Sequence, residues 1–333
     1  MPNLRRTILA ILPFIGLALT VFILSRLVNL GDVLAILAVA RLDWSLAAVA
    51  MTLLAPVIVG IKLWIVLRII DYPATVSRCW SAVLAAVTLN AVLPARGGDF
   101  MRAAFLANGP GTFGLLIGAV MLERLIDVFT LGLLSLLASI GGKAGIVPWI
   151  AGAACVSAVV AIGIMSLGHR FPFKADLAER VGRAARKLLD RPGLAVALVL
   201  TSLLSWVNNV ALMDFCLRAV GAILPLVAVL RATPVAILTG ILPISISGIG
   251  TRDTAMMLLL SKFGQNEAVV AGAFGYTVLA SWFIAAFGLA ALGRETLRRY
   301  RAAAKAGRDN VSSPIGQNAF MEKPAKVDKT IDT

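Results

Sequence analysis

Long continuous runs of apolar residues dominate the chain. The helices of a soluble domain are instead apolar on one face only. A bilayer core of about 30 Å requires roughly 20 mostly apolar residues in helical form. Six segments meet this requirement, at approximately residues 7–25, 44–67, 113–140, 147–167, 194–218 and 267–292. The pattern therefore predicts an all-α polytopic membrane protein with about six full spans.

Two further apolar stretches are too interrupted to be simple spans. The first runs from Leu84 to Pro94 and continues past residues 95–99 into a short helix. The second runs from Leu238 to Pro243 and continues past residues 244–253 into another. Exposed backbone at membrane depth must be surrounded by protein or line a water-filled cavity. We therefore predict two re-entrant hairpins of half-helices, whose backbone is shaped by Asn90, Pro94, Gly97, Gly98, Pro243, Gly248 and Gly250.

The two interrupted stretches resemble each other and predict an internal repeat. Both begin with an L-x-x-x-L-P string, continue with Gly, Arg and Asp, and precede a span that carries a Gly-Ala pair, Gly118-Ala119 or Gly272-Ala273. An odd number of predicted full spans separates the hairpins, so they should open from opposite faces. In such inverted repeats, paired broken helices meet near the midplane and form the substrate site.

Basic residues flank the apolar segments on one side and predict that both termini are cytoplasmic. They are Arg5, Arg6, Arg68, Arg78, Arg170, Lys174, Arg180, Arg183, Arg186, Lys187, Arg191, Arg294, Arg298, Arg299, Arg301, Lys305 and Arg308. Within residues 168–193, apolar positions at helical spacing predict an amphipathic helix at the cytoplasmic surface. We expect a transmembrane domain over residues 1–295 and a basic, then disordered, tail over residues 296–333.

Composition excludes several other classes of protein. The chain is 59% hydrophobic and 14% charged, which is incompatible with a water-soluble globule. Its net charge of +14 comes from basic residues beside apolar segments, so we expect contact with lipid headgroups and no nucleic-acid partner. The single histidine and three dispersed cysteines match no metal, redox or phosphate-loop motif, so we expect no metal site, no cofactor and no enzymatic activity.

Charges at membrane depth are costly and are therefore paired or functional. Glu123 and Asp127 share one face of the third span, and Arg124 is spaced to pair with Asp127. Two interpretations stand: the three bind a polar headgroup or couple proton movement, or they form structural ion pairs with Arg96, Arg102 or Arg252. Lys62, in the second span, is expected to extend to the cytoplasmic interface.

The hairpins contribute the remaining candidates for substrate binding. Asp99 and Asp253 each follow a glycine-containing turn, which favours helix capping. Arg96 and Arg252 stand beside helix N-termini, which favours binding of a lipid phosphate over internal pairing. Polar residues of the fifth span should instead make hydrogen bonds between helices; they are Ser205, Asn208, Asn209 and Asp214.

At the interrupted segments the chain resembles the transmembrane region of the lysylphosphatidylglycerol synthase family, also described as flippase-like integral membrane proteins. The strings that carry the resemblance are N-A-V-L-P-A-R-G-G-D-F-M-R from Asn90 to Arg102, L-E-R-L-I-D from Leu122 to Asp127, and P-I-S-I-S-G-I-G-T-R-D from Pro243 to Asp253. The chain departs from the family pattern at Asp99 and Asp253, where Glu is commoner.

The resemblance implies a domain that moves a phospholipid between leaflets of a bacterial-type cytoplasmic membrane, without the soluble domain that makes aminoacylated lipid. Its substrate would be an anionic or aminoacylated lipid, bound in a central polar cavity. The residues expected to bind the headgroup are Arg96, Asp99, Arg102, Glu123, Arg124, Asp127, Ser247, Arg252 and Asp253.

Two other functions stay open, and so does the oligomeric state. The chain could be an intramembrane transferase acting on a lipid-linked phosphate, although it has no aspartate-rich metal motif. It could also be an accessory protein of lipid metabolism. A Gly-x-x-x-Gly motif at Gly114–Gly118 suggests a possible homodimer.

Overall fold

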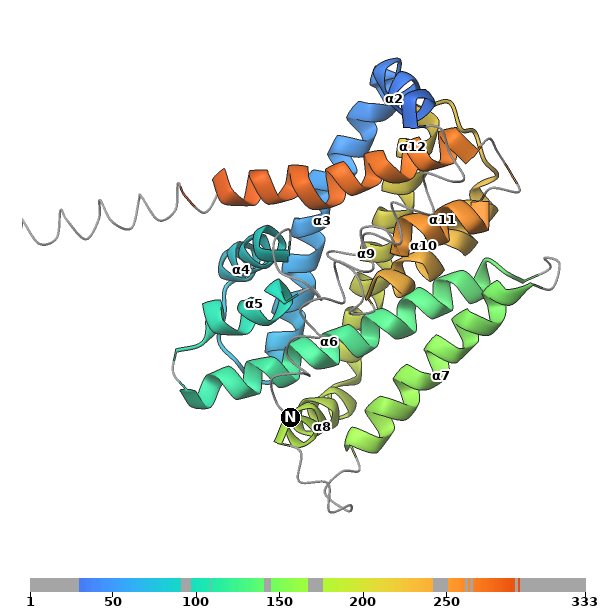
Figure 1. Ribbon diagram of the computed structural model, residues 1–333. Helices are drawn as coiled ribbons and strands as arrows, with labels where there is room; N and C mark the ends of the chain where they lie inside the picture. Colours follow the sequence, from blue (N-terminus) through green and yellow to red (C-terminus); the bar gives the residue numbers. More distant parts are fainter. Residues whose placement is uncertain are drawn as a thin grey trace, which may run out of the picture. The chain divides into compact units, whose positions relative to one another are not determined.

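A computed structural model confirms an all-α polytopic membrane protein (Figure 1). It describes residues 30–90, 97–108, 110–140, 145–166, 176–241, 251–260, 263, 266–290 and 293, and no strand occurs among them. The helices are α2 (Leu30–Ala38), α3 (Leu42–Ile69), α4 (Val76–Asn90), α5 (Gly98–Leu106), α6 (Pro110–Leu137), α7 (Ile146–Ser166), α8 (Asp176–Leu189), α9 (Pro192–Ala219), α10 (Leu226–Ile241), α11 (Thr251–Leu260) and α12 (Asn266–Thr277), which continues through the π-helix η4 (Val278–Phe283) to Ala290.

Four helices in this part of the chain are long and apolar enough to cross a membrane. They are α3, α7, α9 and the continuous helix Asn266–Ala290, and they agree with four of the predicted spans. Helix α6 has 28 residues, which is sufficient length, but it carries Glu123, Arg124 and Asp127 at its centre. The predicted span at residues 7–25 lies outside the described residues.

Helices α3 and α9 form an antiparallel pair in the middle of the fold (Figure 1). The amide of Arg41, just before α3, donates to the carbonyl of Ala219 at the end of α9, over 2.8 Å. At the opposite end, Arg191 donates to the carbonyl of Arg68, also over 2.8 Å. The two helices have 28 residues each and end in similar turns, where Asp71 has φ 60° and Gly221 has φ 80°.

The two interrupted segments form pairs of short antiparallel helices, α4 with α5 and α10 with α11. Gly98, at the start of α5, lies so close to α4 that an added Cβ would be 2.3 Å from the carbonyl oxygen of Ala86. In the second pair, Thr239 near the end of α10 donates to the carbonyl of Thr251 at the start of α11. Helices α5 and α11, of 9 and 10 residues, are too short to cross about 30 Å. The connecting residues 91–96 and 242–250 lie outside the described ranges, so the re-entrant course stays a prediction.

Helix α8 is amphipathic, as the sequence predicted, but its apolar side packs on protein. Val181, Ala184 and Ala185 are buried against α6 and α7. Arg180 lies over Gly114 and Gly118 of α6, where an added Cβ would meet its guanidinium or backbone. The Gly114–Gly118 motif therefore serves a close helix contact within the chain.

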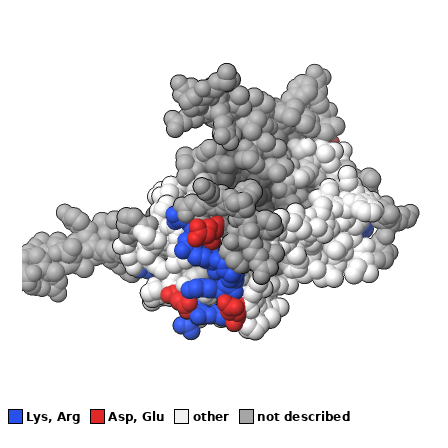
Figure 2. Space-filling view, turned by 90° about the horizontal axis from the view of Figure 1, so that it is seen from below, with Lys and Arg blue, Asp and Glu red and all other residues white. Residues whose placement is uncertain are grey.

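The other side of α8 belongs to a band of basic side chains edged by acidic ones (Figure 2). Here Lys187 and Arg191 pair with Asp71, at 2.9 and 2.7 Å. These two cations lower the pKa of the Asp71 carboxyl below its ordinary value. The same side chains donate to the carbonyls of Ile70 and Arg68, so they also satisfy the C-terminus of α3.

Candidate functional site

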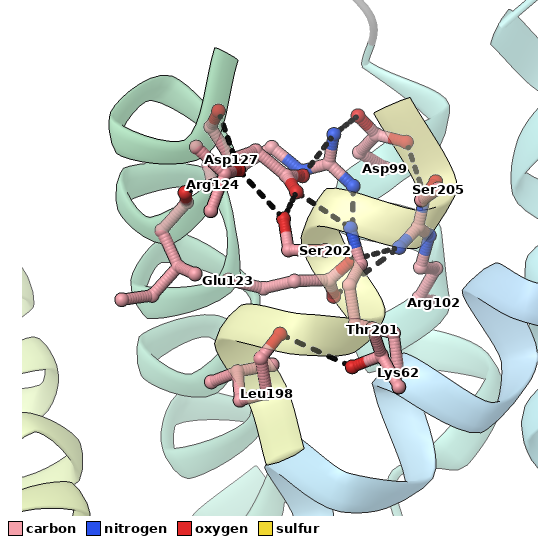
Figure 3. A network of polar contacts seen from close by, with 12 residues as sticks. Lys62, Asp99, Arg102, Glu123, Arg124, Asp127, Leu198, Thr201, Ser202 and Ser205 are labelled. Atoms are coloured by element: carbon pink, nitrogen blue, oxygen red, sulfur yellow. Dashed lines mark hydrogen bonds and ion pairs between the residues drawn. The ribbon is translucent and has the colours of Figure 1, made fainter. Parts of the chain in front are cut away.

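Six charged side chains meet in a buried network between helices that are otherwise apolar (Figure 3). They are Lys62 of α3, Asp99 and Arg102 of α5, and Glu123, Arg124 and Asp127 of α6. The side chain of Arg124 is 21% exposed, whereas those of the other five residues are at most 7% exposed. Three cations face three carboxylates, so the network is neutral when all six groups are ionised.

Glu123 is the common partner of all three cations. Its Oε1 lies 3.2 Å from Lys62 Nζ, 3.0 Å from Arg102 Nη1 and 3.1 Å from Arg124 Nη2. A carboxylate buried without partners would cost several kcal/mol. The three cations offset this cost, and in doing so they hold α3, α5 and α6 in one register.

Asp127 connects the network to α9. Its Oδ1 accepts hydrogen bonds from Lys62 Nζ at 2.7 Å, Ser202 Oγ at 2.7 Å and Trp206 Nε1 at 3.2 Å. Its Oδ2 lies 3.2 Å from Arg124 Nη1. The Asp127–Arg124 pairing agrees with the spacing seen in the sequence, whereas the participation of Trp206 and Ser202 was not foreseen.

Asp99 and Asp253 are not helix caps, contrary to the prediction. The N-cap of α5 is Gly97, and Asp99 is already inside the helix, where its Oδ1 accepts from Asn90 Nδ2 at 3.0 Å and Arg102 Nη2 at 3.1 Å. Asp253 likewise lies in the first turn of α11. In both cases a buried cation of the same turn is a stronger partner for the carboxylate than an amide.

Arg252 belongs to a second, smaller cluster. Its guanidinium donates to Asp253 Oδ1 at 3.0 Å and to the hydroxyl of Thr277, and it lies 4.7 Å from the ring centre of Tyr276. Tyr276 in turn donates to Asn209 of α9 at 2.8 Å. Arg252 is therefore buried and paired within its own half of the chain, and these contacts do not include Glu123 or Asp127.

The two clusters line one cavity of about 170 Å³. Its polar lining includes Lys62, Asn90, Asp99, Arg102, Arg124, Asp127, Ser205, Asn209, Arg252, Tyr276 and Ser281. Both short-helix pairs thus contribute charged side chains to the same space, as the predicted repeat requires. This volume is more than ten times the roughly 10–15 Å³ that one water requires in a cavity, so the space can hold a polar group much larger than a water.

Lys62 is the main residue that sequence analysis misplaced. It does not extend to the interface, because it is 1% exposed and lies between Glu123 and Asp127. A count of charges gives the missing signal: in α6, Arg124 can neutralise one of the two carboxylates, which leaves the other in need of a cation from elsewhere.

Several predicted site residues fall outside the described ranges: Pro94, Arg96, Pro243, Ser247, Gly248 and Gly250. Of the hydrogen bonds expected along the fifth span, Asn208 donates to the carbonyl of Met51 in α3 at 3.1 Å. Across the described part of the chain, no group of three His, Cys, Asp or Glu side chains is placed to hold a metal ion.

Comparison with known proteins identifies the family. The model of the lysylphosphatidylglycerol synthase TM region matches residues 11–288. Comparison with curated proteins gives no match. The matched range includes both short-helix pairs and every charged residue of the cavity. The chain therefore belongs to the family of the lysylphosphatidylglycerol synthase TM region, whose members are multi-pass membrane proteins connected to lipid metabolism or transport.

Proposed function

We propose that this protein moves a phospholipid between the leaflets of the cytoplasmic membrane, with the headgroup held in the charged cavity. The observation that carries the proposal is that both short-helix pairs supply charged side chains to one cavity inside an apolar helical fold. Buried charge of this kind in a membrane protein marks a pathway for a polar substrate. In this proposal both termini are cytoplasmic, and the protein makes or breaks no covalent bond.

The phosphate of the headgroup would bind first to Arg124. This residue lines the cavity, is the most exposed cation of the network, and has a buried Nε with no hydrogen-bond partner among the described residues. Guanidinium groups bind phosphate oxygens through two parallel hydrogen bonds. Arg252 lines the same cavity from the other half of the chain and would receive the phosphate next.

Carboxylates give the cavity a second kind of binding group. Asp99 and Asp127 line it beside Arg124, at 3.7 and 3.2 Å from Nη1 of that residue. When a phosphate draws Arg124 away, these carboxylates lose part of the positive charge that balances them. An ammonium group on the same headgroup would restore it, which favours aminoacylated or amine-containing phospholipids over purely anionic ones.

The test is a leaflet-exchange assay with purified protein in liposomes that contain fluorescent anionic, zwitterionic or aminoacylated phospholipids. Replacing Arg124 with Ala removes at least one charge-assisted hydrogen bond, so exchange should fall about tenfold or more. Arg124→Lys should retain part of the activity, and Arg183→Ala on the exposed side of α8 is the matched control. Exchange by Arg124→Ala at the wild-type rate, or absence of exchange in the wild type, would refute the proposal.

A further inference from the structure

A second pocket, largely apolar, adjoins the charged cavity. We call it the α3–η4 slot; it has a volume of about 110 Å³. Its walls are Thr52, Ala55, Pro56 and Val59 of α3, Val83 and Val87 of α4, Arg102 of α5, Asn209 and Leu212 of α9, Ala280 of η4, and Ile284 just beyond it.

The slot and the charged cavity lie side by side and share part of their walls. Five residues line both: Val59, Val87, Arg102, Asn209 and Ala280. Arg102 extends along this boundary, with its guanidinium held by Glu123 and Asp99 on the polar side. A molecule in the charged cavity therefore finds an apolar surface directly beside it, on the side away from the ion pairs.

Two irregular helix segments line the slot. Pro56 lies inside α3, where it removes one helical hydrogen bond. The second segment, η4, is a π-helix, a rare conformation that occurs frequently at functional sites. Beyond the slot the helices approach closely: Thr88 of α4 donates to Ala285, and an added Cβ on Gly288 would lie 2.5 Å from the Thr88 hydroxyl. The slot thus adjoins a close contact between α4 and the helix that continues from η4.

The helix faces around the slot are suited to lipid. On α3, Leu53, Leu54 and Val57 are exposed next to the slot residues, and on the other side Trp282 and Phe283 are exposed next to Ala280. In a multi-pass membrane protein such large exposed apolar side chains face acyl chains.

We infer that the α3–η4 slot holds the first carbons of an acyl chain of the lipid whose headgroup lies in the charged cavity. This inference rests on the proposed function and specifies its substrate: a molecule with a charged group and an acyl chain, and not a free phosphate. The slot, at about 110 Å³, is smaller than the charged cavity at about 170 Å³, so we place only the carbons nearest the glycerol in it. The rest of the chain would continue into the bilayer.

The first experiment fills the slot at a wall that the charged cavity does not share. Ala55→Trp places a large ring in the slot, whereas Ala50→Trp places the same ring at an exposed position of the same helix. In the leaflet-exchange assay, Ala55→Trp should lower the rate at least tenfold, and Ala50→Trp should stay within about twofold of the wild type. Exchange by a well-folded Ala55→Trp at the wild-type rate would overturn the slot and leave the proposed function intact.

The second experiment needs no variant and no transport. The wild-type protein is photolysed in vesicles containing phosphatidylethanolamine whose diazirine sits on an acyl carbon close to the ester. Labelled peptides should include residues 52–59 or 280–284, and excess unlabelled phosphatidylethanolamine should reduce this labelling, whereas excess glycerophosphoethanolamine, which has no acyl chain, should not. This result would support the slot even if the wild type exchanged no lipid. Labelling confined to other surfaces would overturn it.

Discussion

The two halves of the molecule repeat the same order of long and short helices with different chemistry. Helices α3 to α6 correspond to α9 to α12, and the Gly118-Ala119 and Gly272-Ala273 pairs bring α6 and α12 into register. In this register Thr277 stands at the position of Glu123, and Ser281 at that of Asp127. The first half therefore places carboxylates where the second half places hydroxyl groups.

The difference extends to the cations. When the 28-residue helices α3 and α9 are aligned from their first residues, Lys62 corresponds to Leu212, which is buried and apolar. The charged cluster of the first half thus has three cations and three carboxylates, and that of the second half has Arg252 with Asp253 and a neutral hydroxyl partner. A repeated backbone does not require repeated charge, because each half needs only to satisfy its own buried groups. The ionic half costs more to desolvate, so its stability depends more strongly on each buried charge keeping its partner.

The largest effect should come from removing the shared carboxylate of the ionic half. Glu123→Gln leaves three buried cations against two carboxylates, and we expect it to lower the free energy of unfolding by about 3–5 kcal/mol. Thr277→Val at the corresponding position removes a hydroxyl that contacts Arg252 and Asp253, and should cost about 1–2 kcal/mol. Thermal unfolding of both variants in detergent measures the contrast.

Equal unfolding midpoints for the two variants would show that losing a buried partner costs the ionic half no more stability than it costs the neutral half. Lys62→Met combined with Glu123→Gln supplies the control, because it removes one charge of each sign. Since Lys62 and Glu123 are in contact, the double variant should lose less stability than the sum of the two single changes.

The same contrast explains how far the sequence could be interpreted. Hydropathy found the long helices, and Pro and Gly marked the interrupted segments, because both signals are local. The partner of a buried charge is a tertiary property. Asp99 looked like a cap because its neighbours in sequence are glycines, yet its partners are Asn90 and Arg102. Nothing in the sequence indicated the role of Trp206, because a tryptophan in an apolar helix fits the hydropathy pattern. Its role as a donor depends on Asp127, which faces it only in the folded protein.

A smaller effect should distinguish the turns that end α3 and α9. Both contain a residue with positive φ, which is Asp71 in one half and Gly221 in the other. An added Cβ at Gly221 meets no atom within 4 Å, so Gly221→Ala tests backbone conformation alone and should cost about 1–2 kcal/mol. Gly193→Ala, where φ is ordinary and space is also open, should leave the unfolding midpoint unchanged or raise it. A midpoint unaffected by Gly221→Ala would remove the left-handed turn as a common constraint of the two halves.

The smallest effect should come from the charge that only the first turn carries. Asp71→Asn keeps a residue type that tolerates positive φ but weakens the contacts with Lys187 and Arg191. Because these cations lower the pKa of Asp71, its contribution to stability is complete above the unfolded value of about 3.9 and is lost as pH falls below it. The unfolding midpoints of wild type and Asp71→Asn should therefore differ at pH 7 and converge as the pH falls below about 4. They should also converge in about 1 M salt, since the pair is exposed. A difference that persisted at low pH and high salt would mean that Asp71 acts through backbone geometry, as Gly221 does, and the two turns would then be equivalent.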